Sequence, residues 1–245
     1  MKRLERLARA TAPDGSVMEL HRHDGDYAIR VDGEELMSTR RHHSEDALAE
    51  LVCAPLADHP DARVLIGGLG LGFTLRAALG ALAADARVVV AELVDEVIAW
   101  NRDPVYGISV DAMADPRVEV RHADVTAVIG DAGEGAWDGI MLDVDNGAQA
   151  MTTAGNAALY RADGVRAAAR ALRPGGRVAY WSAGGDAPFE RLIRGAGLRV
   201  ETHRVRAHPS LKSWHTLFVG QRRVKKERAG GTAGEHDGKG AREEA

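Results

Sequence analysis

A short apolar strand that runs directly into a glycine-rich turn constrains this chain more than any other feature. The stretch RVLIGGLGLGF spans residues 63–73. Glycines lack a Cβ atom, so the backbone can turn tightly there and approach a ligand closely. The helix expected to begin near Phe73 directs free N–H groups toward the same point. The pattern predicts a site for a nucleotide-like ligand, bound by Gly67, Gly68 and Gly70.

The next apolar run narrows the class of ligand. RVVVAE ends at Glu92, twenty residues beyond Gly72. A carboxylate in this position can accept hydrogen bonds from ribose hydroxyls. Phe73 stands where the GxGxxG motif of dinucleotide enzymes has its last glycine,. We therefore expect an S-adenosyl-type ligand rather than NAD.

Length and composition allow one α/β core with a small appendage. The chain has 245 residues, of which 45% are hydrophobic, and a formal net charge of −4,. Cys53 is the only cysteine in the sequence, which excludes a disulfide framework and suits a reducing compartment,. The sequence contains neither a signal-peptide core nor a run of about eighteen apolar residues. We expect a cytoplasmic protein without a membrane or nucleic-acid partner, and the mild acidity favours cationic substrates.

Alternating strand and helix signals from residue 63 onward predict a Rossmann-like α/β domain with a mostly parallel sheet. The segments LRVETHRVRAH and WHTLFVG predict a final antiparallel pair, which completes the seven strands of a class I methyltransferase-like fold. The turn signal Arg173-Pro174-Gly175-Gly176 is expected to precede the fifth strand,. The five strands before the antiparallel pair are expected over 63–67, 87–92, 117–121, 138–143 and 176–182. The helices are expected over 72–83, 94–102, 124–130, 156–172 and 187–196.

The two ends of the chain differ from this core. Residues 1–43 form an N-terminal segment in which MELHRH and YAIRV, joined by an Asp-Gly turn, predict a β-hairpin appendage within about 16–39,. Ser44 is expected to cap the first helix of the Rossmann-like domain, residues 44–221,. The polar, glycine-rich residues 222–245 predict a disordered tail,.

Carboxylates follow three of the predicted parallel strands. Ligands of open α/β sheets bind outside the carboxyl ends of the strands. We therefore expect Glu92 at a ribose, Asp124 at an adenine amino group and Asp143 facing the reacting atoms. Two alternatives stay open. Asp124 can instead cap the helix that follows it, and Asp143 with Asp145 can bind a metal or cap a turn with Asn146.

These motifs resemble the spermidine synthase family of polyamine aminopropyltransferases. The resemblance covers about residues 16–220 and rests on the order and spacing of VLIGGLGLGFTLRAAL, VVVAELVDEVI, DPRVEVRHAD, GIMLDVDNGAQA and LYRADGVRAAARALRPGG. It implies that Glu92 and Asp124 hold decarboxylated S-adenosylmethionine as co-substrate. It also implies that Asp143 is the catalytic residue toward a small-molecule amine, and that no metal takes part.

The resemblance extends to the acceptor side of the site. Asp145 and Asn146 follow the fourth strand where the family has its second carboxylate. His43 stands where the family has a tyrosine ahead of a glutamate, and Tyr160 lies where it places an aromatic residue beside the site. These four residues are expected to contact the acceptor. A homodimer formed through the β appendage is expected by analogy.

The glycine loop differs from the family's pattern at residue 71, and this difference is compatible with other functions. The family's loop carries an aspartate that contacts the aminopropyl amine of the donor, and Leu71 stands there in this chain. The alternatives are an S-adenosylmethionine-dependent methyltransferase of small molecules and a non-catalytic nucleoside-binding protein. His21 and His23 are interpreted as exposed residues rather than metal ligands, and Trp181 as either a core residue or part of the pocket wall.

Overall fold

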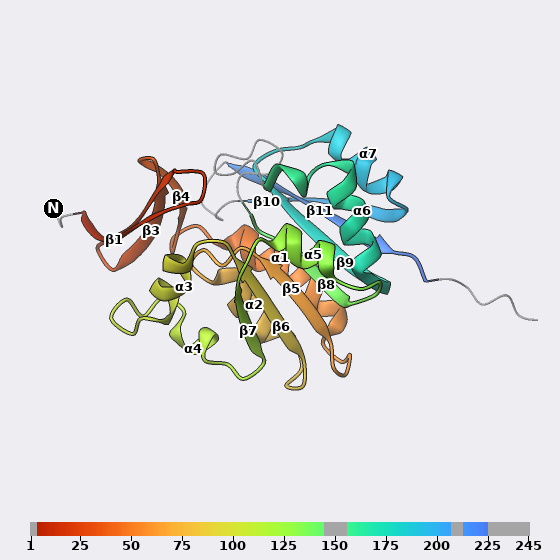
Figure 1. Ribbon diagram of the computed structural model, residues 1–245, viewed down its shortest axis with the longest axis horizontal. Helices are drawn as coiled ribbons and strands as arrows, with labels where there is room; N and C mark the ends of the chain where they lie inside the picture. The colour runs from red at the N-terminus through yellow and green to blue at the C-terminus, as the bar shows by residue number, and fades with distance from the viewer. Residues whose placement is uncertain (1–3, 145–155, 207–212, 225–245) are drawn as a thin grey trace, which may run out of the picture.

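The computed structural model describes residues 4–144, 156–206 and 213–224, which contain two β-sheets (Figure 1). The smaller sheet is antiparallel and has four strands in sequence order, where the sequence predicted only two. The missed first strand exposes Glu5, Arg6, Arg9 and Thr11 and buries only Ala10, so it lacks a strong apolar alternation,. The strands are β1 (Glu5–Thr11), β2 (Val17–His23), β3 (Asp26–Val31) and β4 (Glu34–Ser38).

The larger sheet has seven strands in the order β10-β11-β9-β8-β5-β6-β7. Neighbours from β9 to β7 pair in parallel, whereas β11 runs antiparallel to both β9 and β10. The mostly parallel sheet and its antiparallel end confirm the predicted fold class. The bounds are β5 (Arg63–Gly67), β6 (Arg87–Glu92), β7 (Val118–His122), β8 (Trp137–Leu142), β9 (Leu172–Ser182), β10 (Leu198–Arg206) and β11 (Trp214–Arg222).

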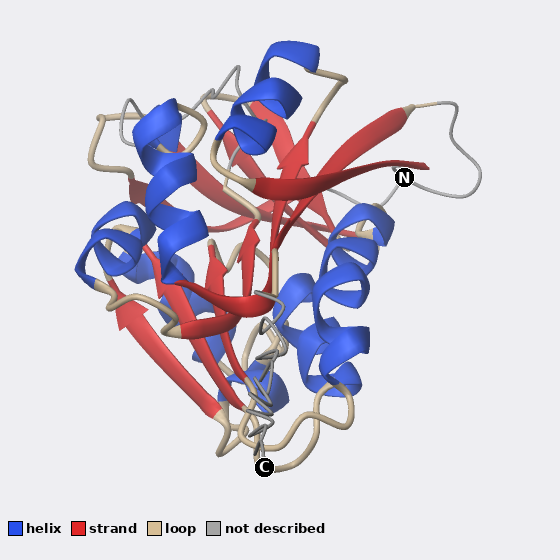
Figure 2. Cartoon of the chain, turned by 90° about the vertical axis from the view of Figure 1, so that its right-hand side faces the viewer, coloured by secondary structure: helices blue, strands red, loops and turns tan. Residues whose placement is uncertain are grey.

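Helices cover both faces of the larger sheet (Figure 2). Side chains alternate between the two faces along each strand. Val64 and Ile66 of β5 therefore pack into the core under α1 to α4, and Leu65 packs into the core under α5 to α7. The helices are α1 (His43–Cys53), α2 (Phe73–Ala81), α3 (Asp95–Arg102), α4 (Val110–Met113), α5 (Val125–Asp131), α6 (Ala162–Ala171) and α7 (Ala187–Gly195).

Two predictions about helices are wrong. Ser44 lies inside the first turn of α1, whose N-cap residue is His42, because the Ser44 hydroxyl bonds to the Glu45 side chain instead of to a backbone N–H. The helix expected over 156–172 is a short 3₁₀ turn at Asn156–Ala158 followed by α6 from Ala162.

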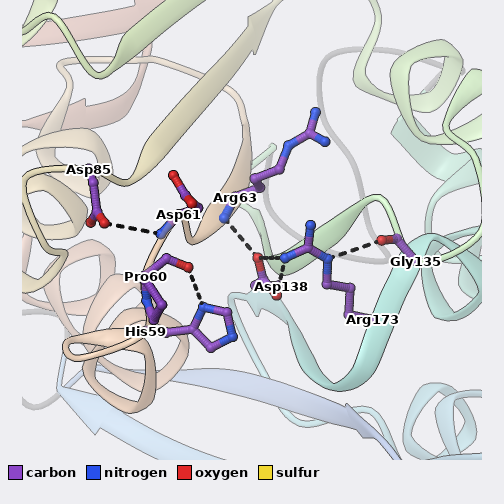
Figure 3. A network of polar contacts seen from close by, with 8 residues as sticks. All are labelled: His59, Pro60, Asp61, Arg63, Asp85, Gly135, Asp138 and Arg173. Atoms are coloured by element: carbon purple, nitrogen blue, oxygen red, sulfur yellow. Dashed lines mark hydrogen bonds and ion pairs between the residues drawn. The ribbon is translucent and has the colours of Figure 1, made fainter.

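The Arg-Pro-Gly-Gly turn lies within β9 as a bulge. The register with β8 passes from Trp137↔Leu172 to Gly139↔Arg177, so four residues of β9 lie outside the paired positions. Arg173 returns from this bulge to the buried Asp138 of β8, with its Nη1 2.8 Å from Oδ2 (Figure 3). The same carboxylate accepts the N–H of Arg63 at 2.8 Å. One buried aspartate therefore ties the start of β5 and the bulge of β9 to β8.

The core contains a buried hydroxyl group whose effect on the free energy of unfolding can be tested. Tyr180 of β9 is fully buried, and its hydroxyl has no hydrogen-bond partner among the described residues. Tyr180→Phe should raise the free energy of unfolding by about 1 kcal/mol, because an unpaired buried polar group carries an uncompensated desolvation cost. Urea denaturation measures this change. The matched control is Tyr160→Phe, which removes a hydroxyl that donates to the Trp181 carbonyl at 3.1 Å, and it should lower stability by a similar amount,.

None of the described helices combines the length and the apolar character needed to cross a membrane.

Candidate functional site

A cavity opens at the ends of β5 and β8, which are neighbours in the large sheet. From β5 the chain adds β6 and β7 on one side, and it then returns to add β8 and β9 on the other side, so the direction of strand order reverses between β5 and β8. Ligands of open α/β sheets bind at such a switch point. The Asp143 N–H donates to the Gly67 carbonyl at 3.0 Å and joins the two strand ends there. The cavity is lined by Ala12, Met18, Ile29, Leu36, Met37, Glu45, Gly68, Gly70, Ala91, Glu92, Leu93, Val94, Val97, Ala123, Asp124, Val125, Asp143, Val144 and Trp181.

The glycine loop is held against two other parts of the chain. Gly68 has a φ of +89°, and a Cβ added to it would lie 2.5 Å from the Asp143 carbonyl oxygen. Only glycine fits this position without displacing the backbone of β8. On the other side, Met37 of β4 covers the loop and its Sδ lies 3.2 Å from the Leu71 N–H. The small sheet therefore forms one wall of the cavity.

Glu92 connects the loop to the end of β6. Its carboxylate is 8% exposed and accepts the N–H groups of Leu69 at 2.8 Å and Val94 at 2.9 Å. Burial raises the pKa of Glu92, and the backbone donors that face the carboxylate oppose that shift,. The residue lines the cavity. Its hydrogen bonds also fix the glycine loop to the end of β6.

Asp124 caps a helix and lines the cavity at the same time. It is the N-cap of α5, and its Oδ1 accepts the Thr126 N–H at 2.7 Å. The structural alternative considered for this residue is therefore correct. It does not exclude ligand contact, because a carboxylate has further lone pairs for a donor in the cavity.

Asp143 follows β8 and faces the same cavity. The Thr74 hydroxyl of α2 donates to its Oδ2 at 2.8 Å. This bond fixes one carboxylate oxygen relative to the helix that begins at the glycine loop. A positioned carboxylate therefore lines the same cavity as Glu92 and Asp124, which suits a proton acceptor or a cation partner,.

Glu45 is a cavity residue absent from the predicted site. It is 7% exposed and lines the cavity with Asp143, although it lies almost one hundred residues earlier in the chain. Burial and the nearby charge of Asp143 raise the pKa of Glu45 to about 8,. The sequence contained a signal, because Glu45 shares the buried helical face of Leu48, Ala49 and Val52. Acidic side chains are rarely buried, so an acidic residue on an otherwise apolar, buried helical face indicates a functional candidate.

The remaining predicted residues lie outside this cavity or outside the described residues. Gly67 is packed against Val125 within β5 and does not line the cavity. His43 lines a second, polar cavity between the small sheet and the start of α1. Tyr160 packs among the rings of Tyr180 and Phe189, whereas Trp181 lines the candidate site. Asp145 and Asn146 fall in 145–155, outside the described residues.

Histidines gather at the second cavity. His21, His23, His42 and His43 line it together with arginines and carboxylates. Among the residues that the structure describes, no three His, Cys, Asp or Glu side chains are placed to hold a metal ion. His42 instead stacks on Phe73 at 4.2 Å between ring centroids and pairs with Asp46 at 2.7 Å.

Comparison with known proteins identifies the architecture. No family model matches the chain. Its fold matches a spermidine synthase in complex with the transition state analogue AdoDATO, with a TM-score of 0.69 and 18% identity over 91% of this chain and 74% of the other. Spermidine synthase from Thermotoga maritima gives a TM-score of 0.69 at 19% identity, over 91% and 75% of the two chains.

The chain has the spermidine synthase fold. A probable spermidine synthase from Corynebacterium glutamicum ATCC 13032 shares it with a TM-score of 0.60 and 19% identity, over 89% of this chain and 80% of the other. In sequence, the chain is 31% identical over 165 residues to ribosomal RNA small subunit methyltransferase H from Azoarcus sp. (strain BH72). The match covers 66% of this chain, which spans about half the length of that curated relative.

Proposed function

We propose that the protein transfers an aminopropyl group from decarboxylated S-adenosylmethionine to a small-molecule polyamine. One observation carries the proposal. Among the described residues, every charged side chain that lines the cavity is acidic: Glu45, Glu92, Asp124 and Asp143. Such a cavity attracts ammonium groups and a sulfonium, and it repels the carboxylate that distinguishes intact S-adenosylmethionine.

Each wall of the cavity has a role in this proposal. Glu92 accepts hydrogen bonds from the ribose and Asp124 from the adenine amino group, while the glycine loop approaches the donor closely. The apolar side chains of Met18, Ile29 and Met37 on the small sheet exclude water and cover the methylene groups of donor and acceptor,.

The chemistry needs a proton acceptor beside the amine. A polyamine nitrogen is protonated at neutral pH and has no free lone pair until it loses a proton. Asp143 draws the cation in and accepts that proton, a contribution of about 10²- to 10⁴-fold. The nitrogen then attacks the carbon next to the sulfonium, and the C–S bonding pair returns to sulfur as a neutral thioether. Orientation and charge placement supply the rest of the rate enhancement.

Methyl transfer is the second candidate function, favoured by the glycine loop. Leu71 is buried, and its N–H faces the Met37 sulfur, so that position offers no carboxylate to an aminopropyl amine. The curated relative is a methyltransferase by name. Methylation of a cationic small molecule by intact S-adenosylmethionine is consistent with these two observations.

One assay separates the two candidates. The purified protein is incubated with putrescine or spermidine and with each donor separately, and the products are followed by mass spectrometry. We expect methylthioadenosine together with an aminopropylated amine. S-adenosylhomocysteine from the intact donor would support methyl transfer instead, and donor binding by calorimetry without either product would support a nucleoside-binding protein.

A further inference from the structure

Two buried residues outside the wall of the candidate site hold the carbonyl oxygens of the glycine loop. Asn101 of α3 donates its side-chain amide to the Gly70 carbonyl at 2.8 Å and to the Val97 carbonyl of its own helix at 2.9 Å. The Ser109 hydroxyl, just before α4, donates to the Leu71 carbonyl at 2.9 Å. Asn101 is 1% exposed and Ser109 is 3% exposed. Two segments that follow β6 therefore support the loop that follows β5.

Asn101 sets the direction of one peptide group in the loop. In a planar trans peptide the C=O and the next N–H point in opposite directions. The Gly70 carbonyl points to Asn101, so the Leu71 N–H points the other way, to the Met37 sulfur at 3.2 Å on the wall of the cavity. A thioether sulfur is a weak acceptor, so this N–H can still serve a stronger acceptor on a ligand. The Asn101 bond therefore keeps a donor directed toward the site.

Ser109 and Arg76 form the second part of this support. Nη1 of Arg76 on α2 donates to the Ser109 oxygen at 2.8 Å and to the Ile108 carbonyl at 2.6 Å. The single hydroxyl proton of Ser109 is therefore directed to the Leu71 carbonyl,. A Cβ added to Gly72, whose φ is +73°, would lie 2.3 Å from the Ser109 oxygen. The chain before α4 thus packs directly against the loop.

Both residues lose local stabilisation by making these bonds. The amide NH₂ of Asn101 faces two carbonyls, which leaves its Oδ1 buried and without a partner among the described residues. An unpaired buried oxygen costs free energy that offsets much of the gain from the two bonds. Ser109 is the N-cap residue of α4, yet its hydroxyl makes no capping bond to that helix, as a serine commonly does,. Stability alone therefore does not explain these two side chains.

We propose that Asn101 and Ser109 are positioning residues that keep the glycine loop in its ligand-binding shape before the ligand arrives. The inference rests on the part of the proposed function in which this loop binds an S-adenosyl donor. Without the two bonds the loop carbonyls need other partners, and the loop adopts its binding shape only part of the time. The apparent dissociation constant then rises by the reciprocal of that fraction. Neither residue lines the cavity, so the chemical step at saturating donor stays the same.

Asn101→Leu tests the proposal through donor binding and turnover. Leucine is close to asparagine in size and cannot donate to the Gly70 carbonyl. We expect the calorimetric dissociation constant for decarboxylated S-adenosylmethionine to rise about tenfold, with turnover at saturating donor within about twofold of the unmodified protein. The Tm should change by less than about 4 °C, because the unpaired Oδ1 is removed together with the two bonds. An unchanged dissociation constant, or turnover that falls as far as affinity, would overturn the positioning role.

Gln221→Leu is the matched control for this substitution. The Gln221 side-chain amide donates to the Gly175 carbonyl at 3.0 Å, in the bulge of β9 rather than at the glycine loop. The variant removes the same kind of bond, so it should alter the Tm by a similar amount and leave donor affinity unaltered. An equal loss of donor affinity in Gln221→Leu would trace the effect to general destabilisation and would contradict the proposal.

Ser109→Ala removes only an oxygen atom, so it tests the proposal even if Asn101→Leu fails to fold. Alanine cannot donate to the Leu71 carbonyl or accept from Arg76. The dissociation constant for the donor should rise about threefold, again with turnover at saturating donor nearly unchanged. Donor affinity equal to that of the unmodified protein would exclude Ser109 from the support of the loop.

Hydrogen exchange measured by mass spectrometry gives a readout that requires no ligand. Peptides that contain residues 67–75 should exchange at least about threefold faster in Asn101→Leu than in the unmodified protein, because the loop opens more often. Saturating decarboxylated S-adenosylmethionine should restore the slow rate, since the bound ligand selects the binding shape. Weaker donor binding together with unchanged exchange of these peptides would mean that Asn101 does not act through the loop.

Failure of the positioning role and failure of the proposed function are distinguishable. Aminopropyl transfer, with donor binding as tight in Asn101→Leu as in the unmodified protein, overturns the positioning role and leaves the function standing. Methyl transfer from intact S-adenosylmethionine, with binding of that donor about tenfold weaker in Asn101→Leu, supports the positioning role and overturns aminopropyl transfer. Absence of any S-adenosyl ligand binding to the folded, unmodified protein overturns both.

Discussion

Asp143→Asn should lower turnover at least about a hundredfold while the affinity for the donor stays nearly unchanged. Asparagine keeps the size of the side chain and an oxygen that can accept the Thr74 hydroxyl, whose bond to Asp143 Oδ2 is 2.8 Å long. It removes the negative charge and the capacity to take a proton from an ammonium group. Single-turnover kinetics together with donor titration by calorimetry separate the chemical step from binding.

The control for this substitution is Asp163→Asn, which makes the same chemical change on the exposed surface of α6. It should leave turnover and donor binding unaltered. Full activity in Asp143→Asn would remove Asp143 from the mechanism. A comparable loss in both turnover and donor affinity would instead indicate that the substitution disturbs the contact between the ends of β5 and β8, where the Asp143 N–H donates to the Gly67 carbonyl.

Glu92→Ala should weaken donor binding by at least about tenfold and lower the free energy of unfolding by about 2 to 6 kcal/mol. The carboxylate accepts two buried N–H groups, those of Leu69 and Val94, and alanine leaves both without a partner. Each orphaned donor costs about 1 to 3 kcal/mol. Urea denaturation and calorimetric titration of the donor measure the two effects separately.

Two further variants show which role of Glu92 dominates. Glu92→Gln retains one carbonyl oxygen, so its stability should lie between that of the alanine variant and that of the unmodified protein. Glu96→Ala, an exposed position in the first turn of α3, is the matched control and should change neither quantity. Donor affinity that is unchanged in Glu92→Ala would exclude its role at the ribose.

The sequence predicted those parts of the fold that repeat a local pattern. The expected strands over 63–67 and 87–92 agree with β5 and β6, because a buried parallel strand is a continuous apolar run bounded by turns,. The glycine loop could be placed for the same reason. Strand β1 was missed because its sequence, ERLARAT, is stabilised by pairing with β2 rather than by its own apolar pattern,.

The residues of the candidate site likewise differ in how well the sequence could place them. Glu92 ends β6, Asp124 lies two residues after β7 and Asp143 directly follows β8, so knowledge of the strand ends was enough to place them along one edge of the sheet. Glu45 reaches the cavity through the packing of α1 against β8 and its neighbours. Its place on a buried helical face marks it as unusual in sequence but does not show which cavity it lines. His43, two positions away on the same helix, faces the second cavity.

A carboxylate lies near each end of β8: Asp138 is buried and Asp143 is half-buried. Asp138 accepts hydrogen bonds from the Arg63 backbone N–H and the Arg173 guanidinium, whereas Asp143 faces the cavity. Five residues of extended chain separate them by roughly 17 Å. The contacts that join β8 to β5 and β9 and the carboxylate that lines the candidate site therefore lie at opposite ends of one strand, so substitutions at one end need not disturb the other,.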